Sequence, residues 1–212
     1  MGEETPLEQG PQQGPQLVPF EVYVGKEEAA AKLEKLATTD LLTGALNREG
    51  LRRYLERAVA PKALLLVDAT NFKAINDKYG YGAGDQVIQA TYKLLSQGVR
   101  PDDVIARWGG DEYVIILNGE SGSENPPEVE QRAVYVAPKE QIAAAKGRIA
   151  QKVSEFLETP HPDYPDLVAV NFDLAVGGIE WSGAPNLQAL ISQAEELMKA
   201  HKKEQHQSGS HR

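Results

Sequence analysis

The stretch RWGGDEYVIIL, residues 107–117, places two glycines and two acids inside an otherwise apolar, strand-like run. The residues on both sides, 103–107 (DVIAR) and 113–117 (YVIIL), are rich in β-branched and aliphatic side chains, so each predicts a strand. A short glycine-containing link between two such strands predicts a β-hairpin, because glycine allows a tight turn and a close approach of the backbone. Asp111 and Glu112 then lie at the hairpin tip. Taken alone, the pattern is also typical of a plain turn, in which Asp and Gly are common.

Predicted strands and helices alternate on both sides of this hairpin, without internal repeats. The unbroken apolar run ALLLVD, residues 63–68, predicts a buried strand, and residues 167–181 predict one or two more. We expect helices at 26–37, from about Asn47 onward, at 71–80, 83–98, 139–158 and 186–203, and short strands at 20–24 and 132–136. This alternation predicts an α/β domain built on one sheet.

Composition excludes several classes of function. The 212 residues are 41% hydrophobic and 25% charged, as in an ordinary globular domain with a sizeable core. The chain has no cysteine, which excludes disulfides and thiolate metal sites. A net charge of −9 argues against a nucleic-acid partner, although one nucleotide neutralised by a divalent metal and a few lysines remains compatible. We find no apolar run long enough to cross a membrane and no signal-peptide pattern, and therefore expect a cytoplasmic protein.

The ends of the chain and one internal segment differ in composition from the rest. Residues 1–18 are rich in Gln, Pro, Gly and Glu, and residues 118–138 (NGESGSENPPEVEQRAVYVAP) are polar with Pro and Gly. The organisation that we expect is a flexible leader at 1–25, a lead-in helix at 26–38, one domain at 39–204 with an insertion at 118–138, and a flexible tail at 205–212.

A further acid in another predicted strand indicates a functional role for the hairpin. Asp68 ends the predicted strand ALLLVD, and ligand sites of α/β sheets often lie at strand ends. If the hairpin lies next to that strand, Asp68 and Asp111 converge, and two such carboxylates suit Mg²⁺ or Mn²⁺. The helix predicted after Asn71 offers backbone N–H groups and Lys73 to phosphates. These parts are those of a metal–triphosphate site.

Five ordered motifs carry a resemblance to a known family. RWGGDEY resembles the signature of GGDEF domains, the diguanylate cyclases, with Tyr113 in place of the usual Phe. TDLLTGALNR (39–48), VDATNFKAINDKYGYGAGD (67–85), RPDD (100–103) and FDLAVGG (172–178) resemble further blocks of the family, in order, so the resemblance runs from about Thr39 to Lys203. It implies a single domain similar to nucleotidyl-cyclase and polymerase palms, with a central, mostly antiparallel sheet flanked by helices.

The resemblance also implies an activity. Two such domains face each other as a homodimer, and each holds one GTP. Each 3′-hydroxyl attacks the α-phosphate of the opposite GTP, which releases pyrophosphate and forms cyclic di-GMP. Such a reaction needs alignment and charge neutralisation, which Mg²⁺ or Mn²⁺ would supply.

Family roles carry over residue by residue. The resemblance implies metal binding by Asp68, Asp111 and the carbonyl of Ala69, with Glu112 assisting either the metal or proton handling. It implies substrate binding by Gly109 and Gly110 along the nucleotide, Phe72, Lys73 and Lys202 at phosphates, and Asn76 and Asp85 at the guanine edge. Arg100 and Asp103 match an inhibitory site that binds the product, although a surface ion pair is the plainer interpretation. For Arg107, a structural salt bridge and a catalytic role are both open.

The chain departs from the family pattern after Lys202. The family usually continues with Gly-Arg-Asn, whereas here K-E-Q-H-Q follows, and His206 falls near the expected arginine. An imidazole is a weak substitute for a guanidinium, so triphosphate binding or turnover should be weaker. Thr70 replaces a common Asp, and Tyr81 a common His. Two alternatives therefore stay open: a catalytically weak domain that acts as a cyclic di-GMP receptor, and a GTP-binding or interaction module.

Overall fold

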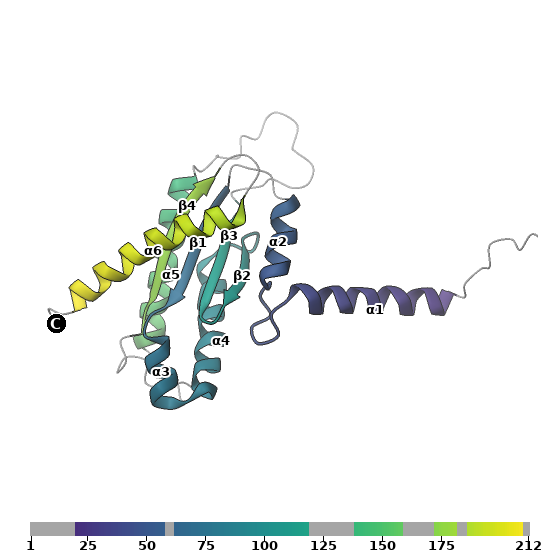
Figure 1. Ribbon diagram of the computed structural model, residues 1–212, viewed down its shortest axis with the longest axis horizontal. Helices are drawn as coiled ribbons and strands as arrows, with labels where there is room; N and C mark the ends of the chain where they lie inside the picture. The colour runs from purple at the N-terminus through teal and green to yellow at the C-terminus, as the bar shows by residue number, and fades with distance from the viewer. Residues whose placement is uncertain (1–19, 58–61, 119–137, 159–171, 182–185, 210–212) are drawn as a thin grey trace, which may run out of the picture. The chain divides into compact units, whose positions relative to one another are not determined.

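A computed structural model of the chain describes residues 20–57, 62–118, 138–158, 172–181 and 186–209 (Figure 1). The chain divides into two compact units, residues 1–35 and 36–212. The described part of the first unit belongs to helix α1 (Phe20–Thr38). The short strand expected at 20–24 is therefore wrong, because these residues are helical. Strong helix formers follow at 26–37, and elongating an existing helix costs little, which explains the earlier start.

The second unit is built on one four-stranded sheet. Its strands are β1 (Lys62–Ala69), β2 (Val104–Gly109), β3 (Glu112–Leu117) and β4 (Leu174–Trp181), in the order β2-β3-β1-β4. Every neighbouring pair is antiparallel. This confirms the antiparallel sheet that the resemblance implies, and it places the apolar run ALLLVD in an inner strand.

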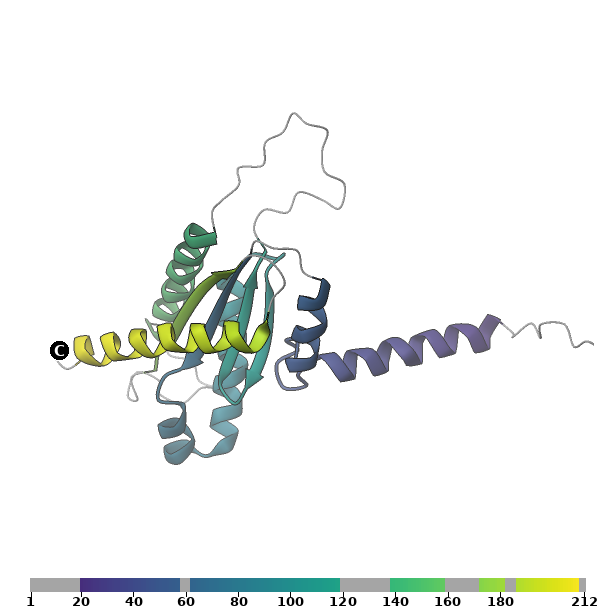
Figure 2. The ribbon, with the colours of Figure 1, turned by 45° about the horizontal axis from the view of Figure 1, so that its top comes forward.

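Among the described residues, five helices cover the two faces of this sheet (Figures 1 and 2). They are α2 (Arg48–Arg57), α3 (Phe72–Tyr79), α4 (Tyr81–Gly98), α5 (Pro138–Glu158) and α6 (Leu187–Gly209). One buried cluster joins the sheet to α3, α4 and α5, and a second joins the opposite face to α2 and α6. The core therefore lies in two layers, one on each side of the sheet.

The predicted helices are confirmed, with one correction at the C-terminal end. Helix α6 continues through Gly209, beyond the helix end expected at residue 203. The sequence KKEQHQS has no proline to end a helix, which explains the extension. The strand expected at 132–136 lies outside the described residues, as do 119–137 of the insertion.

Side chains along each strand alternate between the two faces of the sheet, and this alternation decides on which face the acids lie. In β1, Leu65 and Val67 belong to the cluster under α4 and α5, whereas Leu64 and Leu66 belong to the cluster under α2 and α6. Side chains of a strand alternate between faces, so Asp68 follows Leu66 onto the α2–α6 face. In β3, Ile116 and Val114 also belong to the cluster under α2 and α6, so Glu112, two residues before Val114, lies on that face as well. No helix among the described ranges is long and apolar enough to cross a membrane.

Candidate active site

The signature forms the hairpin between β2 and β3. Its turn contains Gly110 at φ +52°, a left-handed backbone conformation that favours glycine. Arg107 holds this turn, because its guanidinium donates to the carbonyl oxygen of Gly110 at 2.9 and 2.7 Å and pairs with Asp40 at 3.1 Å. Burial raises the pKa of Asp40, but hydrogen bonds from Thr43 and the charge of Arg107 outweigh it and lower that pKa overall. Of the two roles open for Arg107, the structure shows the salt bridge.

Arg48 is a neighbour of the signature to which the sequence patterns alone assigned no role. Its guanidinium lies over the ring of Trp108, 4.6 Å from the centroid, and donates to the Trp108 carbonyl oxygen. A β-carbon on Gly109 would lie 2.8 Å from the Arg48 Nη2 atom, so the guanidinium packs closely against the backbone at this glycine. The Arg48 charge also acts on Glu112. The sequence offered an indication of a role for Arg48, because this residue ends the motif TDLLTGALNR.

Asp68 and Glu112 are directly opposite each other in the β1–β3 pairing, and Asp111 precedes Glu112 at the turn. Directly opposite residues of an antiparallel pair lie on one face with neighbouring β-carbons. Burial, and then the charge of Asp68, raise the pKa of Asp111 to about 6, and the same two causes raise the pKa of Glu112. The charge of Asp68 therefore disfavours the charged forms of the other two acids, as expected of neighbouring carboxylates.

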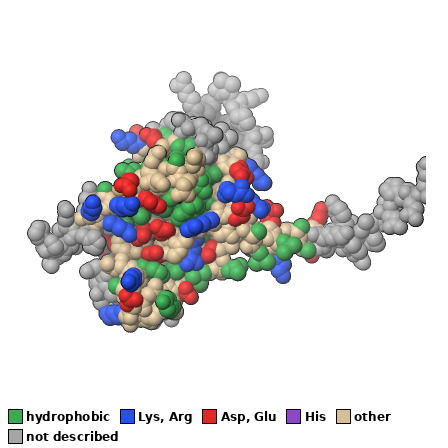
Figure 3. Space-filling view, viewed as in Figure 1, with side chains coloured by type: hydrophobic (Ala, Val, Ile, Leu, Met, Phe, Trp, Pro, Cys, Tyr) green, Lys and Arg blue, Asp and Glu red, His purple; other side chains and the backbone are tan. Residues whose placement is uncertain are grey.

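Lys202 of α6 is a cation that lies beside these acids and pairs directly with one of them. Its Nζ atom lies 2.5 Å from Asp68 Oδ1, and its charge also acts on Asp111 and Glu112. Figure 3 shows acidic and basic side chains interspersed on this side of the domain. Among the described residues, no three His, Asp or Glu side chains are arranged as a metal-binding group. Lys202, which the resemblance predicts to bind phosphates, thus forms an ion pair with Asp68, a predicted metal ligand.

The end of β1 is fastened to the start of β4. Thr70 donates from its backbone N–H and its hydroxyl to the carbonyl oxygen of Asp173, at 2.8 and 3.0 Å, and its hydroxyl oxygen accepts the Asp173 N–H at 2.8 Å. Ala69 pairs with Leu174 one residue before. Asn71 then adopts φ 60°, which turns the chain into α3. Thr70, a departure from the family pattern, therefore has a structural role.

Four of the residues predicted to bind substrate lie on α3 and α4, which pack against each other. The side chain of Phe72 packs against the core, whereas Lys73 and Asp85 are exposed. The Oδ1 atom of Asn76 is buried and has no hydrogen-bond partner among the described residues. A β-carbon on Gly84 would lie 2.0 Å from that atom, so this glycine makes room for the amide.

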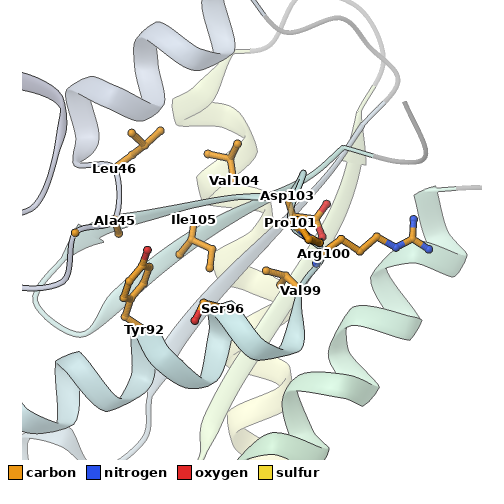
Figure 4. A pocket seen from close by; sticks show the side chains of 11 residues that line it. Ala45, Leu46, Tyr92, Ser96, Val99, Arg100, Pro101, Asp103, Val104 and Ile105 are labelled. Carbon is orange, nitrogen blue, oxygen red and sulfur yellow. Dashed lines mark hydrogen bonds between the residues drawn. The ribbon is translucent and has the colours of Figure 1, made fainter. Parts of the chain in front are cut away.

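The predicted inhibitory pair lies at the opposite end of β2 from the hairpin. Both carboxylate oxygens of Asp103 accept backbone N–H groups at 2.9 Å, from Arg100 and from Asn118. The two residues line a cavity of about 420 Å³ whose apolar lining includes Leu46 and Tyr92. Figure 4 shows the Arg100 side chain pointing away from that lining. Asp103 thus shapes the local backbone, a role that its sequence context did not predict.

Comparisons with known proteins agree with this architecture. Residues 37–139 match the family model described as "Diguanylate cyclase, GGDEF domain". The chain is 30% identical over 141 residues to diguanylate cyclase DosC of Escherichia coli K12, covering 62% of this chain and 30% of that protein. It resembles the crystal structure of the coiled coil and GGDEF domain of DgcB from Caulobacter crescentus in complex with c-di-GMP, with a TM-score of 0.67, 24% identity and coverage of 86% and 90% of the two chains. A structure of the DgcB GGDEF domain alone, also with c-di-GMP, gives a TM-score of 0.60, 26% identity and coverage of 79% and 91%.

The fold is an α/β domain with an antiparallel sheet flanked by helices, and it matches solved structures of GGDEF domains. Over residues 37–139 the chain matches the GGDEF domain model, and it is similar in sequence to proteins named diguanylate cyclases. It spans under a third of the length of the curated relative DosC.

Proposed function

We propose that the domain is a diguanylate cyclase that condenses two GTP molecules into cyclic di-GMP and two pyrophosphates, as a homodimer in the cytoplasm. The observation that carries the proposal is the pairing of Asp68 opposite Glu112, with Asp111 at the adjoining turn. A constellation of three acids at a strand end and a hairpin tip is more than either element needs for folding, and the repulsion within it disfavours a purely structural role.

The chemistry of these acids fits a divalent cation. Hard carboxylate oxygens of Asp68, Asp111 and Glu112, with the carbonyl of Ala69, are the donors that Mg²⁺ or Mn²⁺ prefers. When bound there, such an ion supplies charge neutralisation for the triphosphate and activation of the attacking hydroxyl. The raised pKa of Asp111 supports the proposal, because a nearby cation would offset the repulsion that causes part of it.

The protein's own groups would bind and orient the nucleotide. The buried Oδ1 atom of Asn76, unpartnered among the described residues, is a hydrogen-bond acceptor, and the exposed Asp85 on the neighbouring helix is a second one. An amide and a carboxylate match the donor-bearing edge of guanine, which supports GTP over ATP. Lys73, Lys202 and the backbone N–H of Phe72 would meet the phosphates, and Gly109 and Gly110 leave room for the nucleotide beside the hairpin.

A second candidate, a cyclic di-GMP receptor, rests on Arg100 and Asp103 beside their cavity. In the cyclase proposal the same pair binds product and inhibits the enzyme. An Arg fork suits a phosphate, but Asp103 already accepts two backbone N–H groups, so a guanine would share that carboxylate. The intact acids favour the enzyme over a receptor alone.

Incubation of the purified chain with GTP and Mg²⁺ tests the proposal, with cyclic di-GMP measured by chromatography. We expect product from the wild type and none from Asp111→Ala. Tight binding of added cyclic di-GMP by a wild type that makes no product would support the receptor instead. For product inhibition, Arg100→Ala should raise the cyclic di-GMP concentration that halves the rate. An unchanged concentration would show that Arg100 takes no part in inhibition.

A further inference from the structure

Besides the apolar packing between helix α6 and strand β4, two contacts involve the backbone of one of these elements. At the first, Gly177 packs directly on the helix backbone, because a β-carbon there would lie 2.1 Å from the Ala194 carbonyl oxygen and 2.8 Å from the Met198 nitrogen. At the second, the Nδ1 atom of His201 accepts the backbone N–H of Val176 at 3.0 Å. Because β4 is the outer strand next to β1, the N–H of Val176 is satisfied by a side chain rather than by another strand.

The spacing of these contacts explains what the second one does. Positions 194, 198 and 201 are separated by four and three residues, so they share one face of the helix. Ala194 and Met198 are buried on that face. Lys202 follows His201 directly and reaches from the same turn to Asp68, which pairs with Ala175, the residue before Val176. The hydrogen bond of His201 and the ion pair of Lys202 therefore fasten one helical turn to two neighbouring strands.

We infer that His201 is a positioning residue: its hydrogen bond to Val176 fixes the turn of α6 that presents Lys202 to Asp68. The inference deepens the proposed function, because it names what holds the cation that would meet the triphosphate. That support matters here, since Lys202 is followed by K-E-Q-H-Q and not by a Gly-Arg-Asn segment with a second fixed cation. A lysine side chain is flexible, so the position of its ammonium group depends on how firmly its helical turn is held.

The contact makes a specific demand on the side chain at position 201. An acceptor must be bonded to the γ-carbon, as Nδ1 is in histidine. The Oδ1 atom of asparagine has the same place, whereas the Oε1 atom of glutamine is one bond farther out. His201→Asn should therefore keep the hydrogen bond to Val176, and His201→Gln and His201→Ala should lose it. A residue that merely fills space would instead tolerate glutamine better than asparagine.

Nuclear magnetic resonance of the full chain without nucleotide or metal tests the inference directly. We expect the Val176 amide to exchange with solvent about tenfold faster in His201→Ala and His201→Gln, and within about threefold of wild type in His201→Asn. The side-chain ammonium signal of Lys202, assigned by its loss in Lys202→Met, should weaken in the first two variants and persist in His201→Asn. Lys203→Ala, an exposed neighbour, is the matched control and should change neither signal.

Two outcomes would overturn the inference: an unchanged Val176 exchange rate in His201→Ala, or a faster rate with an unchanged Lys202 signal, which would make His201 a structural contact alone. Neither measurement needs turnover, so a chain without cyclase activity would refute the proposed function and still show whether His201 positions Lys202. If the chain is active, His201→Ala should raise KM for GTP about fivefold with a smaller loss in kcat, and His201→Asn should restore KM.

Discussion

The ammonium nitrogen of Lys202 lies 2.5 Å from the Oδ1 atom of Asp68, which joins the last helix to the first strand of the sheet. The Asp68 side chain is 14% exposed and that of Lys202 is 32% exposed, so the pair is only partly screened by water. The lysine therefore neutralises the carboxylate at which the proposed metal would bind. A divalent cation bound there would compete with Lys202 for the same oxygen, and its binding would release the lysine toward the phosphates.

This competition predicts opposite effects of Lys202→Met on two ligands. Mn²⁺ alone should bind up to about fivefold more tightly, because the ion pair no longer has to be broken. A non-hydrolysable GTP analogue with Mg²⁺ should bind more weakly, because a phosphate contact is lost. Calorimetric titration measures both, with Lys203→Met as the control that should change neither. Equal or weaker Mn²⁺ binding by Lys202→Met would show that the lysine does not compete.

The raised pKa of Asp111 predicts a stability that depends on pH. The pKa is about 6 in the folded protein against 3.8 ordinarily, so between these values the unfolded chain loses the proton first and stability falls as pH rises. Without metal, Asp111→Asn should stabilise the protein at pH 7.5 by about 1–2 kcal/mol, after allowance for solvent screening, and change little at pH 4. Urea unfolding at both pH values measures this, with the exposed Asp102→Asn as control. A variant less stable than wild type at pH 7.5 would contradict the electrostatic explanation.

Close packing of α6 on β4 predicts a large effect of a single methyl group at Gly177. The added β-carbon would meet the helix backbone, so α6 must move, and we expect a loss of about 2–3 kcal/mol in the free energy of unfolding. Gly147→Ala is the matched control, because nothing lies within 4 Å of its β-carbon position in α5 and alanine favours a helix. In thermal unfolding, Gly177→Ala should lower the melting temperature, whereas Gly147→Ala should raise it. Similar melting temperatures for both would mean that α6 adapts freely.

Tyr113, in place of the family's Phe, predicts a small change in stability without a change in function. Its side chain is fully buried, and its hydroxyl donates to the Ile88 carbonyl oxygen at 2.7 Å. Tyr113→Phe should cost about 1 kcal/mol, because one buried hydrogen bond is lost while the ring stays packed. Denaturant unfolding measures the cost, and cyclic di-GMP formation should stay within about twofold. A large loss of activity with unchanged stability would point to a catalytic role for the hydroxyl.

Much of this fold could be predicted because local patterns were strong. The run ALLLVD and the two strands around the glycines were long and apolar enough to be assigned, and the end of α3 at Gly80 follows from its glycine. Residues 20–24 resemble a strand because they are rich in β-branched and aromatic side chains, but the helix that follows them extends over them. Local propensity does not reveal such an extension.

The parts of the site that the sequence left unpredicted depend on contacts between distant segments. The face shared by Asp68 and Glu112 follows from alternation once the strand register is known, and the register is a tertiary property. The contacts of Lys202 with Asp68 and of His201 with Val176 join α6 to the sheet, and nothing in the local pattern around residue 201 signals them. Arg48, by contrast, lies within a recognised motif and could have been proposed.

The most direct test of the central claim follows GTP, pyrophosphate and cyclic di-GMP together by phosphorus magnetic resonance, with Mg²⁺ and increasing concentrations of the chain. We expect two pyrophosphates for each cyclic di-GMP, a rate that rises faster than linearly with protein concentration, and no product from Asp111→Ala, while Asp102→Ala keeps the activity. A folded wild-type chain that leaves GTP unchanged at every concentration, or that releases pyrophosphate without cyclic di-GMP, would contradict the claim.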